Sequence, residues 1–262
     1  MKKPARRFFL KTGGLVAAVL AASAACICNS NSIRRITLEG KTMQAVDLKE
    51  QNKRKVYRQV EAHLYNFFAG NEKEEGYVNF MSKHSSEVQK NLKARGHKSV
   101  VEGYIEVHRK CLDLAMIKAG KAITEEDLDV VAENLVVHME KEAKDTPIDY
   151  LHPAVKEGCK EFTKSRAGFF KKLIERNIEN PRGDYRELVR KAFSREEYEK
   201  EFKAQQTAKI KLYGGFEKSF ENYTSPIPGW AFLVKTFGPG IVRRTKEKSE
   251  EYNKKRDDIW DK

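Results

Sequence analysis

Several short motifs of known chemistry are missing from this 262-residue chain, which also has only four cysteines. No C-x-x-C occurs, and this excludes a thioredoxin-type redox motif and a c-type haem attachment site. No G-x-S-x-G, G-x-G-x-x-G or phosphate loop occurs, so no nucleophile elbow or nucleotide cradle is recognisable. Acidic residues are scattered over predicted helix surfaces and indicate no paired-carboxylate site. These absences favour a protein without catalytic activity.

Proline is also scarce, at seven residues, whereas Lys, Glu, Ala, Leu and Arg fill long stretches. These residues favour helices over strands. From Asp47 onward apolar residues recur at spacings of four and three, as in Val56, Val60, Leu64 and Phe67. We therefore expect an all-α fold, an irregular multi-helix bundle of about six to eight helices. Residues 33–38 form the one candidate strand.

Capping residues and glycines predict where these helices begin, end or bend. Thr124 precedes an acidic turn, where its side chain is suited to cap free amide groups. Ser194 and Glu197 have the spacing of a capping box, and Gly214-Gly215 predicts a kink in the helix that follows. An aromatic stripe at helical spacing in this region is typical of a buried core, and the alternative is stacking on a cofactor or base. The stripe comprises Tyr198, Phe202, Tyr213, Phe216, Phe220 and Tyr223.

Basic residues outnumber acidic ones, 51 to 38, for a formal net charge of +13. Five basic residues lie within the first 25 positions, and removing them leaves a charge of +8. An excess of this size suits anionic partners such as lipid head groups, acidic polymers or nucleic acid. The alternative is a solvated surface, because charges of both signs interleave along the chain.

The amino terminus has a basic segment followed by an apolar run from Gly13 to Ala25. This run is too short to be a comfortable membrane span, and Ala22-Ser23-Ala24 forms an A-x-A cleavage signature. Residues 5–11, with the sequence ARRFFLK, resemble the twin-arginine (Tat) signal-peptide pattern Ser/Thr-Arg-Arg-x-Phe-Leu-Lys. Ala5 replaces the hydroxyl residue of that pattern. The matching residues are Arg6, Arg7, Phe9, Leu10 and Lys11.

The resemblance implies export through a Tat-type translocase, which accepts proteins already folded in the cytoplasm. It implies a location in the periplasm or on the outer face of the inner membrane. Many such exported proteins carry a cofactor, although the signal names none. An export signal also makes nucleic acid an unexpected partner. An ordinary secretory signal and an uncleaved anchor are the alternatives.

The four cysteines offer one lipidation site and one disulfide. Cys26 follows small residues, as in bacterial lipoproteins, but lacks the Leu that usually stands three positions before the modified cysteine. Lipidation of Cys26 is therefore an open alternative to a free mature protein. Cys111 and Cys159 lie on two predicted helices and are a candidate disulfide outside the cytoplasm. The alternative is two buried thiols.

Segment 224–242 differs from the rest because it is apolar and has Pro and Gly at both ends. We expect a loop that tucks across the helical bundle. The alternative is an exposed apolar tip, carrying Trp230 and Phe232, that contacts a membrane or a partner. The chain then divides into a signal peptide (1–25), a polar tether (26–46), a helical domain (47–223), this loop (224–242) and a charged C-terminal helix or tail (243–262).

Three residues are candidate metal ligands. His138 and Glu142 are one helical turn apart, so both side chains leave the same face, and His108 lies on another helix. The chain has no H-E-x-x-H motif, and both histidines lie near apolar faces, where a hydrogen-bonded core histidine is the commoner arrangement.

The sequence favours an exported helical protein of the cell envelope with a non-catalytic binding or structural role. Its basic surface and the segment around Trp230 are the features expected to touch a membrane or an anionic envelope component. The alternative is a cofactor- or metal-bearing enzyme that folds before export, and the class of signal motivates it. The ligand remains unnamed at this point.

Overall fold

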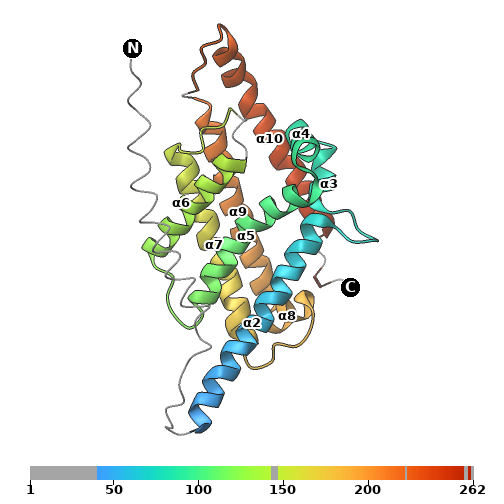
Figure 1. The fold of residues 1–262 in the computed structure, drawn as a ribbon, viewed down its shortest axis with the longest axis vertical. Helices are drawn as coiled ribbons and strands as arrows, with labels where there is room; N and C mark the ends of the chain where they lie inside the picture. The colour runs from blue at the N-terminus through green and yellow to red at the C-terminus, as the bar shows by residue number, and fades with distance from the viewer. Residues whose placement is uncertain (1–39, 143–146, 222, 257–258, 261–262) are drawn as a thin grey trace. The chain divides into compact units, whose positions relative to one another are not determined.

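The computed structural model describes residues 40–142, 147–221, 223–256 and 259–260. These residues form nine helices and no strand, which confirms the all-α multi-helix prediction (Figure 1). The number exceeds the expected six to eight because α3 and α4 are separate helices and α8 is too short to display a helical period. The helices are α2 (Gly40–Ala69), α3 (Tyr77–Ser82), α4 (Ser86–Arg95), α5 (His97–Ile117), α6 (Glu125–Glu142), α7 (Pro153–Asn177), α8 (Tyr185–Ala192), α9 (Arg195–Ser219) and α10 (Trp230–Arg256).

The signal peptide, Cys26 and the candidate strand at 33–38 lie outside the described residues. The structure therefore leaves the predictions for this region as they stand. Residues 46–262 form one compact unit, and the account below concerns that unit.

Helices α7 and α9 pack against each other along much of their length, and α5 and α6 flank α7. Two glycines allow the α7–α9 approach. A Cβ atom on Gly158 would lie 2.7 Å from the Cα of Leu212, and one on Gly215 would lie 2.4 Å from the carbonyl oxygen of Ala154. Real Cβ atoms do not approach other atoms so closely, so these positions need residues without side chains. The α7–α9 pair is thus the central contact of the bundle, and α5 and α6 pack against it through α7.

The predicted helix starts at Thr124 and Ser194 are confirmed. The Thr124 hydroxyl accepts a hydrogen bond from the Asp127 backbone amide at 3.2 Å, at the start of α6. The Ser194 hydroxyl accepts from the Glu197 amide at 3.1 Å, and the Glu197 carboxylate accepts from the Ser194 amide. Each cap satisfies amide groups that have no partner within the helix. Helix α9 then continues through Gly214 and Gly215 to Ser219.

The expected loop at 224–242 is wrong from Trp230 onward, because α10 begins there and contains Pro239. Proline removes one helical hydrogen bond. In this part of α10, however, residues spaced four positions apart pack against the rest of the bundle. Val234, Gly238 and Val242 recur along one face, and Val234 and Val242 join Phe220 in a small buried cluster. Gly238 lies against the Phe220 ring, where a Cβ atom would be 2.6 Å from a ring carbon. Packing on α9 thus outweighs the helix-breaking residues.

The expected burial of this segment is also wrong for its outer face. Trp230 is 47% exposed and Phe232 is 71% exposed, so the alternative of an exposed apolar tip matches the structure. Farther along α10, the Tyr252 hydroxyl donates to the Glu75 carbonyl at 2.8 Å and holds the helix against the segment that joins α2 and α3. Across the described residues, no helix has the length and apolar character that a membrane crossing requires.

Candidate ligand-binding cavity

A cavity of about 940 Å³ lies in the helical bundle, lined by residues from all nine described helices, α2 to α10. Helix α9 contributes one continuous face, from Tyr198 through Lys209 to Phe216. At a rise of 1.5 Å per residue, this face extends for about 27 Å. The volume lies near the upper end of the range found for small-molecule sites in proteins. The cavity is therefore both large and elongated.

Aromatic rings form much of the cavity wall. Five of the six residues in the predicted aromatic stripe line it, and Tyr223 does not. From α2 and α5, Phe68 and Tyr104 stack with their ring centroids 5.7 Å apart, and Tyr77 of α3 meets Tyr104 edge-on at 5.5 Å. The buried-core interpretation thus holds for Tyr198 and Phe220, whereas the other members of the stripe are only partly buried. Stacking on a cofactor or base stays a prediction. Such a wall suits an apolar or aromatic ligand.

Arg166 of α7 reaches the cavity between α5 and α9. Its Nε donates a hydrogen bond to Nδ1 of His108 at 3.2 Å, and its Nη1 donates to the side-chain oxygen of Gln205. The guanidinium carbon also lies 4.6 Å from the centre of the Phe170 ring. All three partners are uncharged, since His108 must have an unprotonated Nδ1 to accept this bond.

Lys209 of α9 is a second cation at the cavity wall. Its ammonium donates to the Ser249 hydroxyl at 2.6 Å, and the Tyr77 hydroxyl donates to the same oxygen at 2.9 Å. Burial, followed by the positive charge of Arg166, lowers the pKa of Lys209 to about 8, and the Glu250 carboxylate partly opposes the shift. Lys209 therefore stays mostly protonated at neutral pH in a setting that disfavours its charge.

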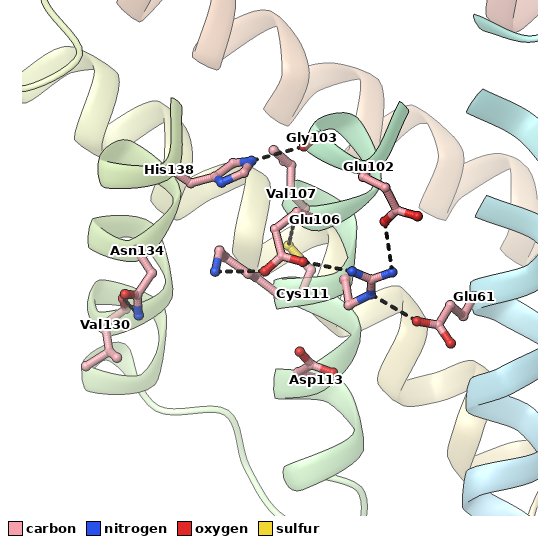
Figure 2. Close-up of polar contacts among 12 residues, drawn as sticks. Glu61, Glu102, Gly103, Glu106, Val107, Cys111, Asp113, Val130, Asn134 and His138 are labelled. Atoms are coloured by element: carbon pink, nitrogen blue, oxygen red, sulfur yellow. Dashed lines mark hydrogen bonds and ion pairs between the residues drawn. The ribbon is translucent and has the colours of Figure 1, made fainter. Parts of the chain in front are cut away.

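Arg109, by contrast, forms ion pairs with three carboxylates, which Figure 2 labels. Glu61 and Glu106 each lie 2.9 Å from its guanidinium, and Glu102 lies at 3.5 Å. Within the described part of the chain, no carboxylate comes within 4 Å of Arg166 or Lys209. Arg166 and Lys209 are each partly buried. A cation withdrawn from water without a counter-ion is costly, and such groups gather at functional sites. These two cations mark the polar centre of the cavity.

His108 lies beside both cations and is not placed as a metal ligand. Burial, followed by the charges of Arg166 and Lys209, holds the pKa of His108 well below its ordinary value. The ring is therefore neutral at physiological pH, in agreement with its role as acceptor from Arg166. Its edge also meets the Phe162 ring at 5.5 Å. His108 thus matches the core-histidine alternative and additionally borders the cavity.

The other two metal candidates have different partners. Nε2 of His138 lies 3.0 Å from the Gly103 carbonyl oxygen. A dashed line in Figure 2 marks this contact. Glu142 forms an ion pair with Arg95. No three His, Cys, Asp or Glu side chains in the described ranges are grouped so that they could hold a metal ion. The structure therefore does not join His108, His138 and Glu142 into one ligand set.

Cys111 and Cys159 are free, buried thiols in the structure, so the candidate disulfide is not formed there. Burial raises the pKa of each thiol to about 12. Both thiols therefore stay protonated at neutral pH and pack as small apolar groups, as the buried-thiol alternative holds. The Cys111 Sγ lies 3.6 Å from the carbonyl oxygen of Val107, one turn earlier in α5.

The exposed apolar residues of α10 border one end of the cavity. Trp230, Leu233, Phe237 and Ile241 line the cavity and are each at least 44% exposed, so they belong to its rim rather than to its interior. We call these four residues the α10 rim. Phe232 is exposed beside them but does not line the cavity. Of the two residues predicted to contact a membrane or a partner, Trp230 therefore lies at the cavity mouth and Phe232 on the outer surface.

Sequence reasoning alone missed Arg166 and Lys209, although one signal pointed to Lys209. It lies seven residues after Phe202 and seven before Phe216, and therefore on the same helical face as the aromatic stripe. A lysine on an apolar face is unusual enough to attract attention. Arg166 offered no comparable pattern among the 51 basic residues.

Comparison with known proteins adds no relative that would identify the ligand. No protein-family model, curated protein or solved structure matches the chain. A functional assignment therefore depends on the chemistry of the cavity and on the residues that line it.

Proposed function

We propose that this chain is an exported, non-catalytic protein of the cell envelope that binds an elongated, largely apolar molecule inside its helical bundle. The cavity of about 940 Å³ is the observation that carries this proposal. Interiors of this kind are normally close-packed, and voids larger than a water molecule are few. A cavity this large forfeits packing energy throughout its wall, which a bound apolar molecule would restore.

The shape and lining of the cavity support a ligand that is long rather than compact. The α9 face that borders it extends for about 27 Å, and its side chains are mainly Tyr, Phe and Leu. The exposed α10 rim supplies a route of entry from outside. A ligand of this kind gains affinity from burial of its apolar surface.

Export is supported by the leader, in which Arg6, Arg7, Phe9, Leu10 and Lys11 match the twin-arginine pattern. The partner proposed from this pattern is a Tat-type translocase, and the proposed location is the periplasm or the outer face of the inner membrane. A pathway that accepts folded proteins suits a bundle that binds its ligand before it crosses. Lipidation of Cys26 would keep the same protein at the membrane surface.

The proposal is tested with the neutral fluorescent probe N-phenyl-1-naphthylamine, titrated into the purified mature protein. Val107 lines the cavity from α5, so Val107→Trp fills part of its volume. We expect saturable binding by the wild type and binding at least about tenfold weaker in this variant, the equivalent of about 1.4 kcal/mol. Val137→Trp is the matched control, because Val137 is 59% exposed on α6 and does not line the cavity.

Two results would contradict the proposal. One is the absence of saturable probe binding by the folded wild-type protein. The other is equal affinity in the wild type and Val107→Trp, with circular dichroism showing that both are folded. The control Val137→Trp should bind the probe with the affinity of the wild type.

A further inference from the structure

Two helices bring separate cations to the same part of the cavity. Arg166 comes from α7 and Lys209 from α9, and both side chains line the cavity wall. Arg166 donates hydrogen bonds to His108 and to Gln205, which lies one helical turn before Lys209 on α9. The two cations are therefore close enough to repel one another. Because like charges repel, holding the two cations close together lowers the stability of the folded protein.

Both cations retain hydrogen-bond donors beyond those engaged within the protein. A guanidinium has five N–H donors, of which Arg166 directs two to His108 and Gln205. An ammonium has three, of which Lys209 directs one to Ser249. The tyrosine hydroxyls beside them also stay protonated, because burial raises the pKa of Tyr213 to about 12 and that of Tyr77 well above its usual value. The polar centre is thus rich in donors and in positive charge.

Carboxylates in the described part of the chain do not neutralise this centre. Glu250 acts on Lys209 only from beyond ion-pair distance. Arg109, by comparison, has three carboxylates within ion-pair distance. An anion placed between the two cations would receive charge-assisted hydrogen bonds from both. It would also remove the repulsion between them.

Apolar wall extends along α9 on both sides of Lys209. Tyr198 and Phe202 precede it, and Phe216 and Phe220 follow it. A molecule bound at the cations therefore needs an apolar body as well as an anionic group. An inorganic anion would leave the aromatic wall without a partner, and a neutral hydrocarbon would leave the two charges without one.

We propose that the cavity binds a long-chain amphiphile whose anionic headgroup, a carboxylate or a phosphate, lies between Arg166 and Lys209. This inference rests on the proposed function and names the chemical class of its ligand. The apolar chain lies along the α9 face, and the headgroup supplies the counter-ion that the two cations lack. Carboxylate and phosphate share the geometry that a guanidinium recognises.

The test compares three ligands that share one hydrocarbon chain: hexadecanoate, hexadecyl phosphate and hexadecan-1-ol. Each is used below its critical micelle concentration to displace N-phenyl-1-naphthylamine from the mature protein. The variants are Lys209→Met and Arg166→Gln. Lys211→Met is the matched control, since Lys211 is an exposed neighbour on α9 that pairs with Glu161 at 3.1 Å and does not line the cavity.

We expect at least one of the two anions to bind the wild type about tenfold or more tightly than the alcohol, since hydrogen bonds to charged groups are strong. Lys209→Met and Arg166→Gln should each reduce this ratio severalfold, and Lys211→Met should preserve it. The affinity for hexadecan-1-ol should change little in any variant. Preference for one anion over the other identifies the headgroup. Because Arg166 also contacts His108 and Phe170, Lys209→Met keeps the test valid if Arg166→Gln does not fold.

Equal binding of the alcohol and both anions, unchanged in Lys209→Met, would overturn this inference and leave apolar binding intact. Failure of all three ligands to displace the probe from a folded wild type that binds it would also overturn the inference. Failure of the probe itself to bind would overturn the proposed function. The two failures are therefore distinguishable.

Discussion

At the scale of single residues, Arg166 and Lys209 differ from many surface cations of the bundle in their hydrogen-bond partners. Exposed lysines such as Lys172 pair with carboxylates, here Glu201. The two cavity cations instead have uncharged hydrogen-bond partners. Evolved sites often hold groups that destabilise the free protein because they serve a ligand. Removal of the Lys209 charge should therefore stabilise the unliganded protein.

The pKa of Lys209 turns this expectation into a pH dependence. Burial lowers its pKa from 10.5 to about 8, so the unfolded chain binds more protons than the folded one between these values. Stability of the wild type should consequently rise between pH 8 and pH 10.5 relative to Lys209→Met, by up to roughly 3 kcal/mol. Urea unfolding of both proteins at pH 7.5 and pH 10 measures the difference. The same comparison with Lys211→Met should show little change, and parallel pH profiles for wild type and Lys209→Met would refute the assignment.

The residue scale also shows where prediction from sequence reaches its limit. The position of Lys209 on an aromatic face follows from helical periodicity, so that residue was within reach. The contact between Arg166 and His108 joins residues 58 positions apart on two helices. Only the packing of α5 against α7 brings them together, and one sequence contains no record of that packing.

At the scale of helices, local signals were dependable where side chains cap the backbone. Thr124 and Ser194 form the bonds that their spacing predicts. Helix α10 was missed because Pro239 and its neighbouring glycines predict a loop from local preference. The packing of Gly238 against Phe220 reverses that preference, and it depends on where α9 lies. Local rules thus failed where tertiary contact decides the outcome.

The α7–α9 contact provides a matched pair of glycine substitutions in adjacent positions. Gly215→Ala places a Cβ atom 2.4 Å from the Ala154 carbonyl oxygen, whereas a Cβ on Gly214 meets nothing within 4 Å. We expect Gly215→Ala to destabilise the fold by about 1–3 kcal/mol through overpacking. Gly214→Ala should stabilise it by roughly 0.5–1 kcal/mol, because alanine favours helix. Thermal unfolding measures both, and effects of the same sign would contradict the close α7–α9 approach.

Helix α10 gives rise to a prediction about membranes. We propose that Trp230 and Phe232, with the exposed Lys235 and Arg244 on the same helix, contact an anionic lipid surface. The variant with Trp230→Ala and Phe232→Ala should float with vesicles that contain phosphatidylglycerol severalfold less than the wild type. A double variant with Ile117→Ala and Val137→Ala, which removes exposed apolar residues from α5 and α6, is the control. Equal flotation of wild type and the α10 variant would exclude this contact.

At the scale of the whole molecule, composition and periodicity were sufficient to predict the fold class. They were insufficient to predict the cavity, because an internal volume depends on how far helices lie apart. The aromatic stripe on α9 is compatible with a filled core or with a lined cavity, and the sequence pattern is the same in both. The charge of +8 outside residues 1–25 likewise does not distinguish the two cavity cations from the many surface ones.

The central claim is that the bundle holds an apolar ligand in this cavity, and native mass spectrometry of the mature protein tests it most directly. The wild type incubated with hexadecanoate or hexadecan-1-ol should retain one bound molecule per chain. Val107→Trp should lose this adduct, and Val137→Trp should keep it. A wild-type spectrum without a specific adduct for any of these ligands, or an adduct equally abundant in Val107→Trp, would contradict the account.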